Sequence, residues 1–162
     1  KIYFPREVLT IASVTAKFVN MLLASVVVFG FLVFSHVGIS WHLLLVPFVM
    51  IAEYLLALGL TLFFSAVTVY LRDMEYIVGV LLQAWIWATP IMYAIDAIPV
   101  FVGHILLLNP MTLVITSYHN LLYYHQLPTA LTWIGMYVFG IVILFIGEVV
   151  FTHLEGNFAE EL

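Results

Sequence analysis

The sequence contains no cysteine and few charged residues, and each absence excludes a class of protein. Without cysteine there is no disulfide framework, no thiolate metal site and no cysteine nucleophile. Charged residues make up only 8% of the chain, and four Lys and Arg side chains cannot form a face that neutralises nucleic-acid phosphates. The glycine-rich pattern G-x-x-x-x-G-K-[ST], which cradles ATP phosphates, is also missing. We therefore expect no nucleic-acid partner and no nucleotide or other cofactor bound by this chain.

Apolar residues dominate what is present. They make up 65% of the 162 residues, where soluble domains have about 45–50%. A soluble globule of this size could not cover so much apolar surface, so most of the chain is expected to lie in lipid. Backbone groups in lipid must be paired internally, and the apolar runs do not alternate with polar residues as barrel strands do. The sequence therefore predicts an all-α membrane protein.

Four apolar runs have about the length that a helix needs to cross a hydrocarbon layer of about 30 Å. They cover residues 8–34, 43–70, 74–94 and 131–152 of a single transmembrane domain, and Pro90 is expected to kink the third. Residues 99–108 and 110–124 are too short to cross, so we expect re-entrant or interfacial helices there. Asn109 followed by Pro110 is typical of a helix N-cap and first turn.

The positions of the basic residues predict the orientation. Lys1, Arg6, Lys17 and Arg72 lie before the first run, in its near half, or in the turn after the second. Residues 35–42 and 95–132 contain no Lys or Arg, so the positive-inside rule places them outside. Four crossings then put both ends of the chain in the cytoplasm, with the two short helices on the external side.

Two charged residues lie deep within the predicted crossings. Glu53 begins a stripe of small or polar residues on the second run, which we expect to contact another helix; its other members are Ala57, Thr61, Ser65 and Thr68. The carboxyl group is either a proton or ion site or a partner in an interhelical hydrogen bond, and the sequence favours the second. Lys17 shares a face with Ser13 and Asn20, and this face should meet protein or water. No His has the spacing of a metal site, so no metal ligand is predicted.

Four motifs in order resemble the permeases of ABC transporters that export polysaccharides. They are YFPRE at residues 3–7, VYLRD at 69–73, TPIMY at 89–93 and NPM at 109–111. The resemblance covers the whole chain, although Leu71 stands where the family usually has Phe. It implies an ABC-2 type permease of six spans in the bacterial cytoplasmic membrane, serving O-antigen, capsule or teichoic acid export. This chain would be a C-terminal fragment with the last four spans.

The resemblance also implies partners. The family works as a homodimer with a separate ATPase subunit that binds ATP and Mg, so the permease itself is not an enzyme; the cargo is a lipid-linked glycan, and membrane lipid surrounds the spans. Contacts to the ATPase would come from residues 3–7 and the turn after the second span. The candidates there are Tyr3, Phe4, Arg6, Glu7, Arg72, Asp73 and Glu75. The two short helices would form an external gate, bounded by Pro99, Asn109 and Pro110.

The third run supplies the candidates for the export path. Tyr76, Gln83 and Trp87 lie on one helical face, and Trp87 would offer a flat surface to sugar rings, as aromatic linings do in this family. Trp85 points about 200° away from Trp87 and cannot share that face. The alternative is that Gln83 bonds a neighbouring helix and both Trp side chains pack. Tyr118 is a further candidate for glycan contact, against an ordinary aromatic position at the interface.

Two other functions stay open from the sequence. An ABC-2 permease for a small lipid or drug would share the general architecture. A membrane-embedded glycolipid-modifying enzyme would need a deep acid–base pair or a cluster of metal-binding carboxylates. Among the acidic residues only Glu53 lies deep, while Asp96 and Glu148 lie near the ends of their segments.

Overall fold

The computed structural model describes residues 7–35, 38, 40–71, 73–93 and 95–156, and every regular element among them is a helix. Three segments are long and apolar enough to cross a membrane: α1 (Glu7–Phe34), α6 (Ala130–Glu155), and α2 (Val46–Tyr70) with the 3₁₀ turn η1 (Trp41–Leu45) before it. By helical rise α1, α2 and α6 are about 42, 38 and 39 Å long. The all-α membrane fold expected from composition is thereby confirmed.

The third helix is shorter than the sequence predicts. The expected helix covers residues 74–94, whereas α3 (Met74–Trp87) ends seven residues earlier and is about 21 Å long by helical rise. The cause is Pro90, which has no backbone N–H and disfavours helical backbone at Thr89 before it. The backbone turns at residues 88–90 and continues into the short 3₁₀ helix η2 (Ile95–Ala97).

A sharply bent helix pair follows. The pair consists of α4 (Val100–Leu106) and the continuous segment formed by α5 (Pro110–His119) and the π-helical turn η3 (Asn120–Tyr124). The pair is bent by 108° at the break between its two arms, so it forms a re-entrant loop or a broken span. The Asn109 side chain accepts a hydrogen bond from the Met111 N–H at 3.0 Å, which confirms the N-cap predicted from Asn-Pro.

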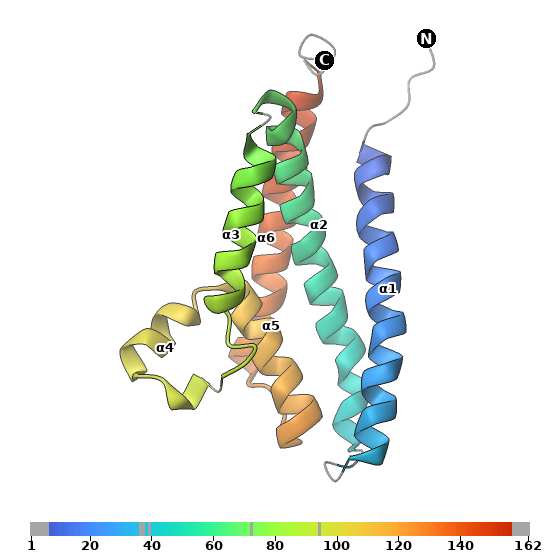
Figure 1. Cartoon of the computed structure of the whole chain (residues 1–162), viewed down its shortest axis with the longest axis vertical. Helices are drawn as coiled ribbons and strands as arrows, with labels where there is room; N and C mark the ends of the chain where they lie inside the picture. The colour runs from blue at the N-terminus through green and yellow to red at the C-terminus, as the bar shows by residue number, and fades with distance from the viewer. Residues whose placement is uncertain (1–6, 36–37, 39, 72, 94, 157–162) are drawn as a thin grey trace.

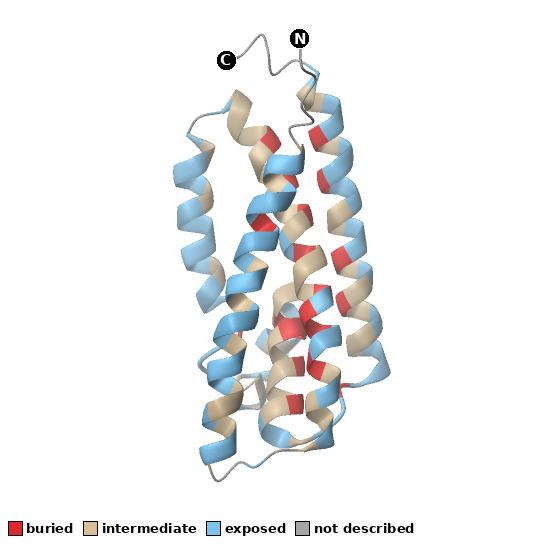
Figure 2. Cartoon of the chain, turned by 90° about the vertical axis from the view of Figure 1, so that its right-hand side faces the viewer, coloured by how far each residue is buried: buried red, intermediate tan, exposed pale blue. Residues whose placement is uncertain are grey.

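The core lies where α2, α5 and α6 meet, and buried residues gather on these helices while α1 and α3 are largely exposed (Figure 2). Glycines let α2 and α6 approach closely. A Cβ on Gly59 would meet the backbone of Ile143 and Leu144, and one on Gly147 would meet the backbone of Gly59. Ala52 is fully buried beside this contact. Small residues, and not bulky core side chains, therefore form this contact and let the two backbones approach closely, as is usual between helices in lipid.

The stripe predicted on α2 faces α1 and not α6, because Glu53, Ala57 and Thr61 line a cavity together with Ser13 and Lys17. Below Glu53, Thr61 and Thr68 donate to the carbonyls of Ala57 and Phe64 on their own helix, at 2.7 Å each. Hydroxyls bonded in this way have no proton left for another helix. The face that meets α6 is instead the neighbouring one, which carries Ala52, Leu56, Gly59, Leu62 and Ala66.

The start of α1, the end of α2, the start of α3 and the end of α6 lie at one end of the molecule (Figure 1). Tyr70 Oη donates to the carbonyl of Leu154 at 2.9 Å, and Thr152 Oγ1 donates to Glu7 Oε1 at 3.4 Å. The pair α4 and α5 lies in the opposite half, together with η1 (Figure 1). This arrangement places the segments predicted to be cytoplasmic together and the segments predicted to be external together.

Candidate functional site

The three predicted path residues of α3 lie on its exposed face. Tyr76 and Trp87 are 78% and 77% exposed, and Gln83 is also exposed. No residue of α3 is buried, so within the described chain this helix packs only lightly, mainly against α2. The structure thus keeps Tyr76, Gln83 and Trp87 together on a surface that no described segment covers.

Tyr118 lies elsewhere. Its hydroxyl donates a hydrogen bond of 2.6 Å to Glu53 Oε2, so this side chain joins α5 to α2. It is only partly buried, at the edge of a cavity of about 270 Å³ that Phe29 and Ser25 of α1 also line. The structure therefore does not bring Tyr118 together with the exposed face of α3. Of the two interpretations of Glu53, this bond supports the interhelical hydrogen bond.

The end of α3 is held by a polar cluster. Asn109 Oδ1 accepts from Trp85 Nε1 at 2.8 Å, and Asn109 Nδ2 donates to the Ala88 carbonyl at 3.1 Å and to Thr89 Oγ1 at 3.0 Å. The Thr89 hydroxyl in turn donates to the Trp85 carbonyl at 2.9 Å. Asn109 thus makes hydrogen bonds to two helices, because it caps the N-terminus of α5 and pairs a free backbone carbonyl at the C-terminal end of α3.

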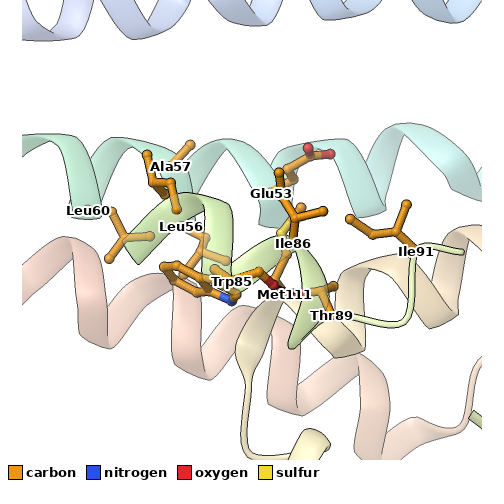
Figure 3. A pocket seen from close by; sticks show the side chains of 10 residues that line it. Glu53, Leu56, Ala57, Leu60, Trp85, Ile86, Thr89, Ile91 and Met111 are labelled. Carbon is orange, nitrogen blue, oxygen red and sulfur yellow. Dashed lines mark hydrogen bonds between the residues drawn. The ribbon is translucent and has the colours of Figure 1, made fainter. Parts of the chain in front are cut away.

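A mainly apolar cavity of about 250 Å³ lies between this cluster and α2 (Figure 3). Its lining includes Trp85, Thr89 and Met111 on one side and Glu53 and Leu56 on α2. In the close view the Glu53 carboxyl group points away from Trp85 and toward α1 (Figure 3). The cavity therefore has apolar walls, with polar groups at its edges.

Lys17 faces a second cavity, of about 310 Å³, between α1 and α2. Ser13, Glu53, Tyr54 and Thr61 line the same space. Thr15 bridges the two helices nearby, with its hydroxyl 2.9 Å from Tyr54 Oη. Ser13 and Lys17 on the predicted polar face of α1 thus border a cavity shared with α2, although both, like Asn20 on the same face, are exposed.

The predicted ATPase contacts are only partly within the described chain. Tyr3, Phe4, Arg6 and Arg72 lie outside it. Asp73 is exposed at the N-cap position of α3 and makes no side-chain cap, and Glu75 is exposed in the first turn. Glu7 begins α1. Of the gate candidates, Pro99 precedes α4 as its N-cap residue, and Asn109 and Pro110 begin α5.

Sequence reasoning missed the role of Trp85 and Thr89. The two residues are four positions apart, on the side of the predicted helix opposite Trp87. An indole N–H and a hydroxyl on one helical face need hydrogen-bond acceptors when they are packed, so this spacing could have indicated a polar contact. Sequence reasoning also missed that Tyr118 is the partner of Glu53. No local pattern could have supplied that pair, since 65 residues separate the two. Among the described residues no group of three or more His, Asp or Glu side chains could hold a metal ion.

Long apolar helices, polar contacts between them and a bent outer pair define a multi-pass all-α membrane protein. The chain belongs to the ABC-2 type transporter family, whose family model matches residues 3–123. With its apolar helices, this membership identifies it as a multi-pass protein of the bacterial cytoplasmic membrane.

The chain is similar along its whole length to three curated relatives. It is 30% identical over 164 residues to the O-antigen export system permease protein RfbA of Myxococcus xanthus, covering 100% of this chain and 63% of the relative. It is 29% identical to two proteins of the same description from Klebsiella pneumoniae, again covering all of this chain and 62% of each relative. The chain thus spans slightly less than two thirds of the length of the relatives it matches.

Proposed function

We propose that this chain is part of the permease subunit of an ABC transporter that exports a lipid-linked polysaccharide across the cytoplasmic membrane. The cargo is of the O-antigen, capsule or teichoic acid type. ATP with Mg is bound and hydrolysed by a separate ATPase subunit, and two permease copies enclose the path. The observation that carries the proposal is the similarity along the whole chain to O-antigen export permeases.

The exposed face of α3 is the proposed path surface. By helical rise Gln83 lies about 14 Å from the start of α3, and a primary amide at that depth is unfavourable against lipid. A water-filled path between two copies removes that cost. Tyr76 and Trp87, on the same face, present flat aromatic surfaces that suit sugar rings.

The end of the molecule where α3 begins is the proposed contact with the ATPase. Asp73 and Glu75 are exposed there, and Arg72 comes directly before Asp73 in the sequence. Glu7 at the start of α1 lies at the same end (Figure 1). In this proposal residues 3–7 and the turn before α3 receive the movement of the ATPase.

The bent pair is the proposed external gate. It lies in the opposite half of the molecule, and α4 is a helix of only seven residues with exposed apolar side chains. Pro99 begins its first arm, and Asn109 with Pro110 begins its second. A broken helix at this position can change its angle without unwinding a continuous span.

Complementation of a strain that lacks its own export permease tests the proposal. The full-length protein together with its ATPase should restore glycan on the surface of intact cells, detected with a glycan-specific antibody. A variant of the ATPase without its phosphate-binding Lys should abolish the signal. Surface glycan that persists with this variant would refute ATP-driven export. Extrusion of a small lipid or drug without any surface glycan would assign the permease to the rival substrate class.

A further inference from the structure

Asn109 uses its whole hydrogen-bonding capacity at the junction of α3 and α5. A side-chain amide offers two N–H donors and two acceptor lone pairs. Both lone pairs accept, from Trp85 Nε1 and the Met111 N–H, and both protons are donated, to the Ala88 carbonyl and Thr89 Oγ1. No other side chain of this size combines these groups, since Asp has no donor and Ser or Thr has a single proton.

The bonds from α3 come from one side of that helix. Trp85 lies about 200° around the axis from both Gln83 and Trp87. Consequently the bond between Trp85 and Asn109 fixes the rotation of α3, and with it the direction in which Gln83 and Trp87 point. A rotation of α3 by one residue would carry the indole about 100° away and break the bond.

Packing does little to fix that rotation. No residue of α3 is fully buried, and only Met74, Val78 and Trp85 are half-buried, so hydrophobic burial alone holds the rotation of this helix weakly. In contrast, α5 is firmly placed, because Thr112, Leu113, Val114 and Ser117 are all buried in the core. Asn109 therefore ties a weakly held helix to a fixed one.

We propose that Asn109 is a positioning residue that clamps the rotation of α3, so that Gln83 and Trp87 face the export path and Trp85 faces the core. The clamp also holds the far end of α3, while its near end follows the turn at Asp73. A displacement delivered at that turn then tilts α3 about Asn109 instead of sliding it. The part of this inference that concerns the path rests on the function proposed above.

Cysteine accessibility tests the clamp directly, because the described chain has no cysteine of its own. Single cysteines are introduced by Leu82→Cys, Gln83→Cys, Ile86→Cys and Trp87→Cys in the full-length permease assembled with its ATPase in membranes, after replacement of any cysteine outside this chain. A water-soluble maleimide reacts with thiols in water and not with thiols in lipid or core. Cysteines at 83 and 87 should react fast, and those at 82 and 86 should react more slowly, because these two positions are half exposed and border the apolar cavity beside α2.

Removal of the clamp should reduce this contrast. Trp85→Phe removes one bond and should lower the ratio of fast to slow labelling several-fold, whereas Asn109→Ala removes four and should lower it by about tenfold or more. Adding Trp85→Phe to Asn109→Ala should have no further effect, because the bond that Trp85→Phe removes is already lost. Asn109→Asp keeps the acceptor for Trp85 and loses both donors, so it should give an intermediate ratio.

Matched controls are available within the chain. Asn20 is exposed on α1 and Trp41 is exposed in η1, so Asn20→Ala and Trp41→Phe should leave the labelling ratio unchanged. If the Asn109→Ala permease does not assemble with its ATPase, the labelling ratio of Trp85→Phe tests the clamp, since this variant leaves the N-cap of α5 intact. An unchanged ratio in Trp85→Phe, or additive effects in the double variant, would overturn the clamp. So would slow labelling at both 83 and 87 in the parent protein.

The same experiment separates the clamp from the proposed function. If the ratio falls as expected but the parent protein places no glycan on the cell surface, the clamp stands and the export proposal falls. If export is restored and Asn109→Ala changes neither labelling nor export, the export proposal stands and the clamp falls.

Discussion

Tyr118 and Glu53 form a hydrogen bond of 2.6 Å between α5 and α2, 65 residues apart in the chain. A carboxyl group at this depth in a membrane-spanning helix is costly unless a polar group satisfies it. The phenol hydroxyl of Tyr118 supplies that group, and its bond ties the second arm of the bent pair to the core. The same carboxyl group borders the cavity that Lys17 lines.

Removing the hydroxyl should destabilise the protein. Tyr118→Phe leaves the Glu53 carboxyl group without this donor, and we expect a loss of about 1 kcal/mol in the free energy of unfolding, the scale of interhelical hydrogen bonds in membranes. Glu53→Gln keeps an acceptor oxygen for Tyr118 and should cost less. Unfolding in mixed micelles with increasing SDS measures both. Tyr123→Phe is the control, since Tyr123 is 63% exposed; an equal effect of the two Tyr changes would contradict the prediction.

The close contact between α2 and α6 should tolerate no side chain at its centre. Gly59→Ala places a methyl group against the backbone of Ile143 and Leu144, which cannot move as a flexible side chain would. We expect a loss of about 1–3 kcal/mol in stability as the helices are forced apart. Gly79→Ala on α3 meets nothing within 4 Å and should be neutral or slightly stabilising. Thermal unfolding of the purified protein in detergent compares the two, and similar melting temperatures would argue against the contact.

Trp87 should matter for export and not for stability. The side chain is 77% exposed, so Trp87→Ala should leave the amount of protein in the membrane and its melting temperature unchanged. Loss of an aromatic surface for sugar should lower the rate of surface glycan appearance by about tenfold. Trp41→Ala, also exposed but outside α3, serves as the control. Normal export by Trp87→Ala at normal protein levels would remove this residue from the path.

The turn before α3 should bind the ATPase through its charges. The double change Arg72→Asp with Asp73→Arg keeps the net charge of the turn and reverses the order of its positive and negative side chains. We expect the ATPase to be lost on co-purification and export to fail, because like charges then face each other across the contact. Asp96→Asn, on the predicted external side, should have no such effect. Intact co-purification and export by the exchanged variant would refute this contact with the ATPase.

Much of the helical architecture follows from the sequence because lipid restricts the choices. Backbone groups in hydrocarbon must bond within their own segment, so each long apolar run must form a helix of nearly its own length. This reasoning placed α1, α2 and α6 to within three residues, and Asn109 followed by Pro110 marked the start of α5. The end of α3 was predicted wrongly because the effect of Pro90 extends back to Ala88 in this structure. There the Asn109 side chain donates a hydrogen bond to the Ala88 carbonyl and so caps the helix.

Only the tertiary structure decided which helix faces meet. Spacing along α2 defines both the stripe from Glu53 and the stripe through Gly59, yet it cannot say which of them packs against α6. Spacing along α3 likewise separates Trp85 from Trp87 without showing which one points inward. In a soluble helix the polar face would answer this question, but here nearly every face is apolar and burial gives no direction. Close approach at Gly59 and the three bonds of Asn109 to Trp85, Ala88 and Thr89 supply that direction, and both depend on partners far away in the sequence.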